Sequence, residues 1–132
     1  MLRESSIGYR TGTSENRSKH YDLEERTFVF ARDVRAFLRR VPATLANIED
    51  GKQLLRASGS VGSNYIEANE ALGKKDFLMR IKISRKESKE SRFFLRLLDV
   101  GGKPDTEAER TRLIAESTEI MNILGSIYRK SA

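Results

Sequence analysis

Apolar side chains recur at intervals of three and four residues in four separate segments, which is the spacing of one face of an α-helix. The first predicted helix has its N-cap at Asp22, with Glu25 three residues later, and ends at Pro42. Its expected inward residues are Leu23, Thr27, Phe30, Val34, Phe37, Leu38 and Val41. Residues 1–20 are polar and basic and lack this periodicity, so we expect a flexible tail there.

Three further helices are predicted after Pro42. The second extends to Gly73, and its expected inward residues are Ile48, Leu55, Ser58, Gly62, Tyr65, Asn69 and Leu72. The third begins near Asp76, and its expected inward stripe is Phe77, Ile81, Ser84, Ser88, Ser91, Leu95 and Leu98. The fourth follows a loop over residues 100–105 and a capping box of Thr106 and Glu109. Its expected inward residues are Leu113, Ser117, Ile120, Met121, Leu124, Ile127 and Tyr128.

No stretch alternates in the manner of a β-strand, so the chain is predicted to be all-α. Four helices with short connections favour an up-and-down antiparallel four-helix bundle. At 132 residues in total, the chain is long enough for one such domain, which we place at residues 21–132.

Small residues occupy positions where a helix normally buries aliphatic side chains. Gly59 and Gly62 favour a close helix crossing over a ligand-approach site, and the serines of the third helix are the expected facing surface. Asn64 and Glu67 would need polar partners if they point inward, and Arg80, Arg85 or those serines are candidates.

Charge is separated by sign along the third predicted helix. Its cations share one flank, and they are Lys82, Arg85, Lys89, Arg92 and Arg96. Asp76, Glu87 and Glu90 share the other flank. The first helix carries a shorter row made of Arg32, Arg35 and Arg39. Three interpretations remain open: long stems covering apolar shoulders of the bundle, contacts with phosphate groups, and pairing between subunits.

Three apolar residues of the third helix, Met79, Phe93 and Leu97, lie off the inward stripe. Three such side chains on one outer face indicate a second buried surface, and oligomerisation is the simplest explanation. Opposite charges on the two flanks suit a head-to-tail contact, which closes into a ring when the rotation allows it.

Several classes of function are disfavoured by composition. The chain has no Cys and a single His, His20, so no disulfide framework, metal site or other cofactor is expected. No paired titratable groups typical of an active site are recognisable, and an enzyme is not expected. Neither a signal peptide nor a membrane span is recognisable, which favours a cytoplasmic protein.

Several motifs together carry a family resemblance over about residues 21–130. They are Leu54-Leu55-Arg56-Ala57-Ser58, Ser63-Asn64-Tyr65-Ile66-Glu67-Ala68, Lys75-Asp76-Phe77, Lys82-Ile83-Ser84-Arg85-Lys86-Glu87 and Phe94-Leu95-Arg96-Leu97-Leu98. This pattern resembles the bacterial four-helix-bundle proteins encoded by intervening sequences in 23S ribosomal RNA genes. A related branch is similar to the accessory variability protein of diversity-generating retroelements. The resemblance implies a nucleic-acid-binding homopentamer that works with a reverse transcriptase, and no catalytic residues.

The net charge of +6, together with the two cationic rows, favours an anionic partner. We therefore predict a non-enzymatic, oligomeric protein that binds RNA or DNA mainly through phosphate contacts from all eight cations of the two rows. The alternative is a protein-interaction scaffold whose cations meet acidic surfaces of a partner. A small hydrolase would require carboxylates gathered between subunits.

Overall fold

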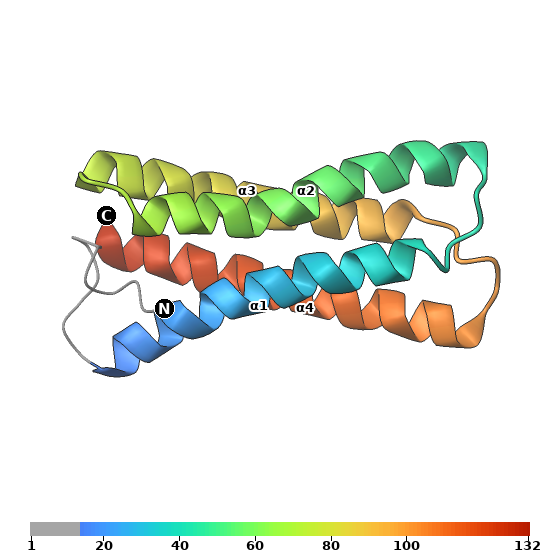
Figure 1. The fold of residues 1–132 in the computed structure, drawn as a ribbon, viewed down its shortest axis with the longest axis horizontal. Coiled ribbons are helices and arrows are strands. Elements are labelled where there is room, and N and C mark those ends of the chain that lie inside the picture. The colour runs from blue at the N-terminus through green and yellow to red at the C-terminus, as the bar shows by residue number, and fades with distance from the viewer. Residues whose placement is uncertain (1–13) are drawn as a thin grey trace.

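The computed structural model describes residues 14–132 and consists of four long helices (Figure 1). They are α1 (Ser14–Leu38), α2 (Leu45–Asn69), α3 (Lys74–Leu97) and α4 (Pro104–Ser131). No strand occurs over residues 14–132, and the predicted all-α, four-helix class is confirmed.

Successive helices run antiparallel, so α1 begins at the end of the molecule where α4 finishes (Figure 1). Each helix packs against the two that are next to it around the bundle: α1 against α2 and α4, and α3 against α2 and α4. The pairs α1 and α3, and α2 and α4, therefore lie on the diagonals. This arrangement decides which surface residues can act together.

Two predicted helix starts are wrong. α1 begins at Ser14, eight residues before Asp22, so residues 14–20 are helical and not part of a tail. A helix that is already nucleated by core packing extends through polar residues at little cost. The remaining part of the predicted tail, residues 1–13, lies outside the described residues.

The second wrong helix start is that of α4. This helix begins at Pro104, in its first turn, with Lys103 as the N-cap, and not with a capping box of Thr106. The fixed φ of proline suits the first helical position, where no N–H partner is required. The preceding turn uses Gly101 and Gly102, whose positive φ values of 74° and 71° suit residues without a Cβ.

Asn47 joins two loops that are far apart in the sequence. Its buried amide donates to the carbonyl oxygens of Pro42 (2.9 Å) and Asp99 (2.8 Å) and accepts from the Asp99 N–H (3.0 Å). Thr44 is the N-cap of α2, and its side chain accepts a hydrogen bond from the Asn47 N–H. One side chain therefore fixes the α1–α2 loop against the end of α3.

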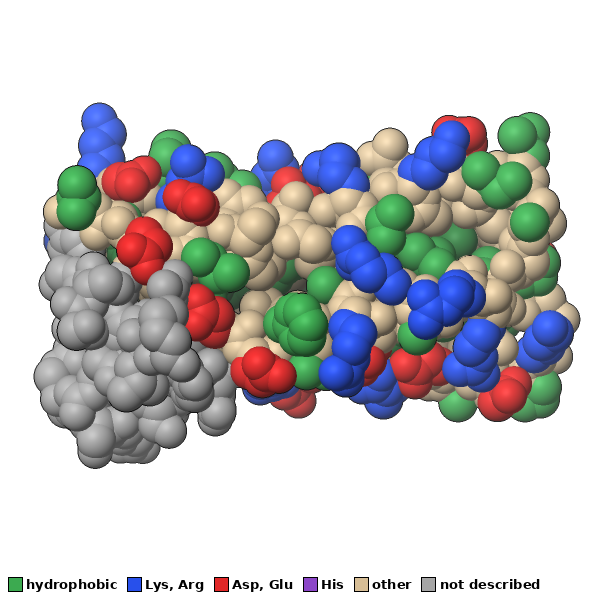
Figure 2. Space-filling model, viewed as in Figure 1, with side chains coloured by type: hydrophobic (Ala, Val, Ile, Leu, Met, Phe, Trp, Pro, Cys, Tyr) green, Lys and Arg blue, Asp and Glu red, His purple; other side chains and the backbone are tan. Residues whose placement is uncertain are grey.

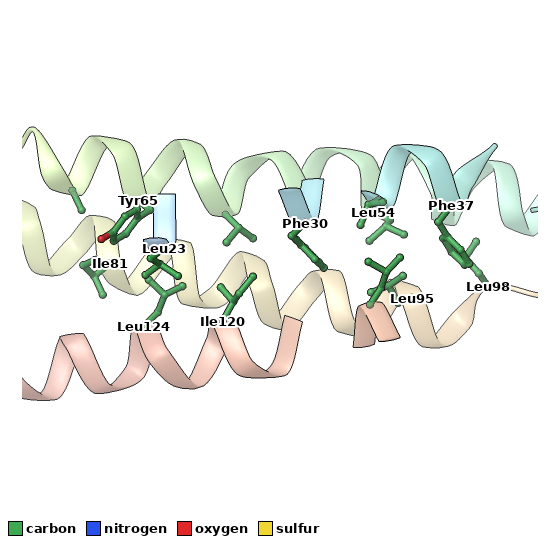
Figure 3. Close-up of a cluster of buried hydrophobic side chains, with 14 of the residues drawn as sticks. Leu23, Phe30, Phe37, Leu54, Tyr65, Ile81, Leu95, Leu98, Ile120 and Leu124 are labelled. Atoms are coloured by element: carbon green, nitrogen blue, oxygen red, sulfur yellow. The ribbon is translucent and has the colours of Figure 1, made fainter. Parts of the chain in front are cut away.

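The core runs the length of the bundle, from Tyr65 and Ile81 at one end to Phe37 and Leu98 at the other (Figure 3). Each fully buried Leu, Ile or Phe contributes about 1.5–3 kcal/mol relative to an exposed position. The inward residues predicted for the first, third and fourth helices are buried or packed against this core, except Met121, which is half-buried and lies outside the core cluster.

The inward face of α2 was predicted one position out of phase. Ile48, Leu55 and Leu72 are exposed, whereas Ser58, Tyr65 and Asn69 are buried as expected. The apolar residues that α2 does bury are Leu54, Ala57, Val61 and Ala68. A seven-residue repeat can start at Leu54 or at Leu55. A repeat from Leu54 also buries Val61, whereas a repeat from Leu55 would bury Gly62, which has no side chain to pack.

Gly59 and Gly62 of α2 face α1, not the α3 serines. A Cβ on Gly62 would lie 2.9 Å from Thr27 Oγ1, and one on Gly59 would lie 3.4 Å from Arg35 Nη2. On the α3 side, Ser84 Oγ donates to the Val61 carbonyl at 2.6 Å. Close packing by small residues is therefore present at both α1–α2 and α2–α3, with different residues at each.

Candidate nucleic-acid interface

The cations of one flank of α3 lie over α4 and form what we call the α3 basic row: Lys82, Arg85, Lys89, Arg92 and Arg96. Lys82 Nζ lies 5.9 Å from the centre of the Tyr128 ring, and Arg92 donates to Thr118 Oγ1 at 3.4 Å. Arg85 Nε lies 3.3 Å from the point that a Cβ on Gly125 would occupy. The row thus follows the line where α3 and α4 meet.

No member of the α3 basic row forms an ion pair with a carboxylate among residues 23–132. Other arginines behave differently. Arg26 pairs with Glu116 and Glu119, each at 2.8 Å, and Arg112 pairs with Glu109 at 2.7 Å and Asp33 at 2.8 Å.

These paired arginines lie between α1 and α4. Hydrogen bonds that Arg26 donates to Glu116 and Arg112 donates to Glu109 are the main reasons that the pKa values of these two arginines are raised above their ordinary value. Arg110 is also engaged internally, since it pairs with Glu107 and donates to the Leu98 carbonyl at the end of α3. Arg26, Arg110 and Arg112 are therefore paired among residues 23–132, whereas the five cations of the α3 basic row are not.

The α1 basic row, Arg32, Arg35 and Arg39, lies on a different face. Arg35 is directed over α2, where its Nη2 lies near Gly59. Arg32 has a weak contact with Asp33 at 3.4 Å, and Arg39 is exposed. Because α1 and α3 are diagonal, the two rows do not form one continuous surface.

Figure 2 shows basic side chains gathered around apolar ones toward the end where α1 connects to α2. Exposed apolar residues on these two helices include Phe28, Ile48, Leu55 and Ile66. A shallow hollow lined mainly by Leu38, Val41, Ile48 and Leu55 lies at the same end. This face combines positive charge with apolar surface (Figure 2).

The opposite flank of α3 meets α2 and uses its acidic residues internally. Arg56 of α2 lies 3.8 Å from Glu87 and 3.5 Å from Glu90. Glu87 is buried, and one of its carboxylate oxygens has no hydrogen-bond partner. Burial, with a smaller contribution from Glu90, raises the Glu87 pKa, and Arg56 opposes the shift.

Of the polar partners expected for Asn64 and Glu67, only one is present. Asn64 accepts a hydrogen bond from Arg80 at 3.2 Å and donates to the Ser60 carbonyl. Glu67 is exposed and takes no part in it, and Arg85 points to α4 instead.

The predicted oligomer-interface residues of α3 all reach the surface. Met79, Phe93 and Leu97 are 47%, 53% and 51% exposed. Phe93 also contacts Phe94 edge-on, with ring centres 5.2 Å apart. These side chains lie between the basic flank and the acidic flank.

Sequence reasoning missed two residues of the α3–α4 surface. Arg129 Nη1, like Arg85 Nε, lies 3.3 Å from the position of a Cβ on Gly125. The available signal was the spacing of four residues between Gly125 and Arg129, which places both on one side of α4.

Features of other functional classes are not seen in the described region. Over residues 23–132, no group of three or more His, Asp or Glu side chains could hold a metal ion. No helix within residues 14–132 combines the length and apolar character that crossing a bilayer requires.

The chain is thus a basic four-helix bundle with an uncompensated row of cations along one helix–helix junction. Residues 19–126 match the family model of the 23S rRNA-intervening sequence protein, and the chain belongs to that family. It is also similar to a crystal structure from Bacteroides thetaiotaomicron VPI-5482, described as a protein with unknown function from the S23 ribosomal protein family. Identity is 27%, the TM-score is 0.69, and 84% of this chain and 98% of the other are covered. No curated protein matches the chain.

Proposed function

We propose that this protein is a non-enzymatic nucleic-acid-binding bundle that contacts phosphate groups through the α3 basic row. The observation that carries the proposal is the row itself: five cations over α4 with no carboxylate partner among residues 23–132. Phosphate backbones supply regularly spaced negative charge, which a linear row of Lys and Arg matches without reading bases.

The other two interpretations of the row explain less. If the aliphatic parts of these Lys and Arg side chains only covered apolar surface of the bundle, the carboxylates of α3 could lie on either flank. All of them lie on the opposite flank. Pairing between subunits would use Glu87 and Glu90, but these already lie near Arg56 within the same chain. The α3 row is therefore available for an external anion.

Assembly is part of the proposal. Met79, Phe93 and Leu97 would pack against a second copy, and a ring of subunits would repeat the α3 basic row around its circumference. The sequence resemblance to the accessory variability protein of diversity-generating retroelements supports a pentamer and a role as an accessory factor to a reverse transcriptase.

A second candidate function is a protein-interaction scaffold, and the α1–α2 face favours it. That face places exposed Phe28, Leu55 and Ile66 beside Arg35, a combination suited to a partner with apolar and acidic groups. The two functions are compatible because they use different faces.

The test of the main proposal is binding of labelled duplex RNA and duplex DNA, measured by fluorescence anisotropy from about 50 to 200 mM salt. Each phosphate contact contributes a log-log slope of about −0.9 on B-form DNA, so three to five contacts predict a slope of roughly −2.7 to −4.5. Affinity should depend little on sequence. If the wild-type protein binds neither duplex at about 50 mM salt, the proposal is wrong and the scaffold function is favoured.

A further inference from the structure

Gly125 lies in the interior of α4, buried beneath two guanidinium groups from different helices. Arg85 Nε of α3 and Arg129 Nη1 of α4 each lie 3.3 Å from the position where its Cβ would be. Both groups thus converge on one point of the α3–α4 surface, close enough for a ligand of phosphate size to touch both.

Two cations that converge repel one another unless an anion lies between them. Neither the Arg85 nor the Arg129 guanidinium group has a carboxylate partner or a hydrogen bond among residues 23–132; Arg85 takes part only through its backbone carbonyl, which accepts from Ser88 Oγ. Lys82 is close by, since its Nζ lies over the ring of Tyr128, the neighbour of Arg129. The local charge is therefore strongly positive and uncompensated within the chain.

The glycine itself needs an explanation. Glycine in a helix interior is less favourable than alanine by about 1 kcal/mol, and Gly125 does not have the positive φ that would require it. An alanine methyl group would press against both guanidinium groups at 3.3 Å. Glycine thus allows the two arginines to lie low against α4, side by side.

From this geometry we infer that Arg85 and Arg129 form a clamp for one phosphate group above Gly125, with Lys82 adding a third positive charge. Guanidinium groups suit this role because they present paired donors in a plane that matches phosphate oxygens. Where the phosphate belongs to a nucleic acid, the inference rests on the proposed function and fixes one point of its path. A phosphate-bearing small molecule would use the same chemistry.

The favourable effect of cations at a helix C-terminus accounts for Arg129 alone. It does not account for Arg85, which reaches the same point from the neighbouring helix. The convergence of the two side chains is the feature that points to a shared ligand.

The decisive variant is Gly125→Ala, which pushes both guanidinium groups outward by a few tenths of an ångström but leaves the charge unchanged. Gly59→Ala is its matched control, because that Cβ would meet only Arg35, on another face. Both changes favour helix formation, and both variants should melt at or above the wild-type temperature. Duplex affinity at about 50 mM salt should fall about tenfold in Gly125→Ala and stay unchanged in Gly59→Ala.

A second measurement separates the two sources of phosphate. Inorganic phosphate is titrated into the protein while the Arg85 Nε–H resonance is followed by NMR. We expect a saturable shift in the wild type and a weaker one in Gly125→Ala. If the wild type binds no duplex but this shift is present, the clamp serves a small phosphate ligand and the proposed function fails.

Two results would overturn the clamp. In the first, Gly125→Ala binds duplex as tightly as the wild type, which leaves a diffuse row of charge and keeps the proposed function. In the second, neither duplex nor inorganic phosphate binds the wild type, and both proposals fall together.

Discussion

The two flanks of α3 carry opposite charges, and the neighbouring helices treat those charges differently. On the α2 side, Glu87 and Glu90 lie near Arg56, and Ser84 donates a hydrogen bond to a backbone carbonyl of α2. On the α4 side, the cations of the α3 basic row meet a hydroxyl group, an aromatic ring and a glycine. The acidic flank makes its contacts within the chain, whereas the basic flank has no carboxylate partner among residues 23–132 and is free to contact another molecule.

The largest expected effect is on the α4 side. Arg85→Glu, Lys89→Glu and Arg92→Glu combined should weaken duplex binding at least about 100-fold at low salt, since three phosphate contacts become repulsions. The helical circular-dichroism signal should stay unchanged because these residues are at or near the surface. Fluorescence anisotropy measures the affinity.

The matched control is the triple change of Arg32, Arg35 and Arg39 to Glu, which alters the net charge equally. This row lies on another face, so we expect a clearly smaller loss of affinity. Equal losses in the two triple variants would mean that binding follows total charge and not the α3 flank.

The outer face between the two flanks gives the next prediction. Phe93→Glu should dissociate the expected oligomer, because a charge replaces an exposed aromatic ring in the proposed contact. Sedimentation at micromolar concentration measures the mass. Leu72→Glu is the control, since it changes an equally apolar and more exposed residue outside α3. A wild-type monomer of 15.0 kDa at every concentration would contradict the idea.

How far the sequence predicts this arrangement differs between the helices. The sign separation on α3 and the stripe through Phe77, Ile81 and Leu95 follow from helical periodicity alone, and the structure confirms them. The α2 face could not be chosen in the same way, because adjacent Leu54 and Leu55 fit the same rhythm. Only packing against α1 and α3 decides between them.

The candidate site shows the same limit. Periodicity places Arg85 on a basic flank, but the convergence of Arg85 with Arg129 depends on how α3 and α4 cross. Which cations are already paired is equally a tertiary property: Arg112 and Arg85 look alike in the sequence, yet only Arg112 meets carboxylates.

Packing on the α2 side gives a prediction of intermediate size. Ser84→Leu should destabilise the protein by about 1–3 kcal/mol or more, because Ser84 Oγ lies 2.6 Å from the Val61 carbonyl and leaves no room for a larger side chain. Ser84→Ala separates the steric effect from the loss of the hydrogen bond, because it removes only the hydrogen bond. It should cost about 1 kcal/mol. Urea denaturation measures both. Wild-type stability of Ser84→Leu would show that this flank is open like the α4 side.

The smallest expected effect concerns the acidic flank and depends on pH. Burial raises the Glu87 pKa in the folded protein above its ordinary value of 4.5, so the native state holds this proton more tightly than the unfolded chain does. The wild type therefore loses stability as the pH rises from about 4.5 through the raised pKa. Glu87→Gln removes the buried charge and should be more stable at pH 7 by roughly 1 kcal/mol.

That gain should disappear near pH 4, where the wild-type carboxyl is protonated and resembles the amide. Urea denaturation at pH 4 and pH 7 measures the difference, and exposed Glu67→Gln should show none at either pH. Arg56 is more than half exposed, so losing its 3.8 Å contact with Glu87 costs little. A lower stability of Glu87→Gln at pH 7 would mean that the ion pair with Arg56 stabilises the fold by more than the burial of the Glu87 charge destabilises it.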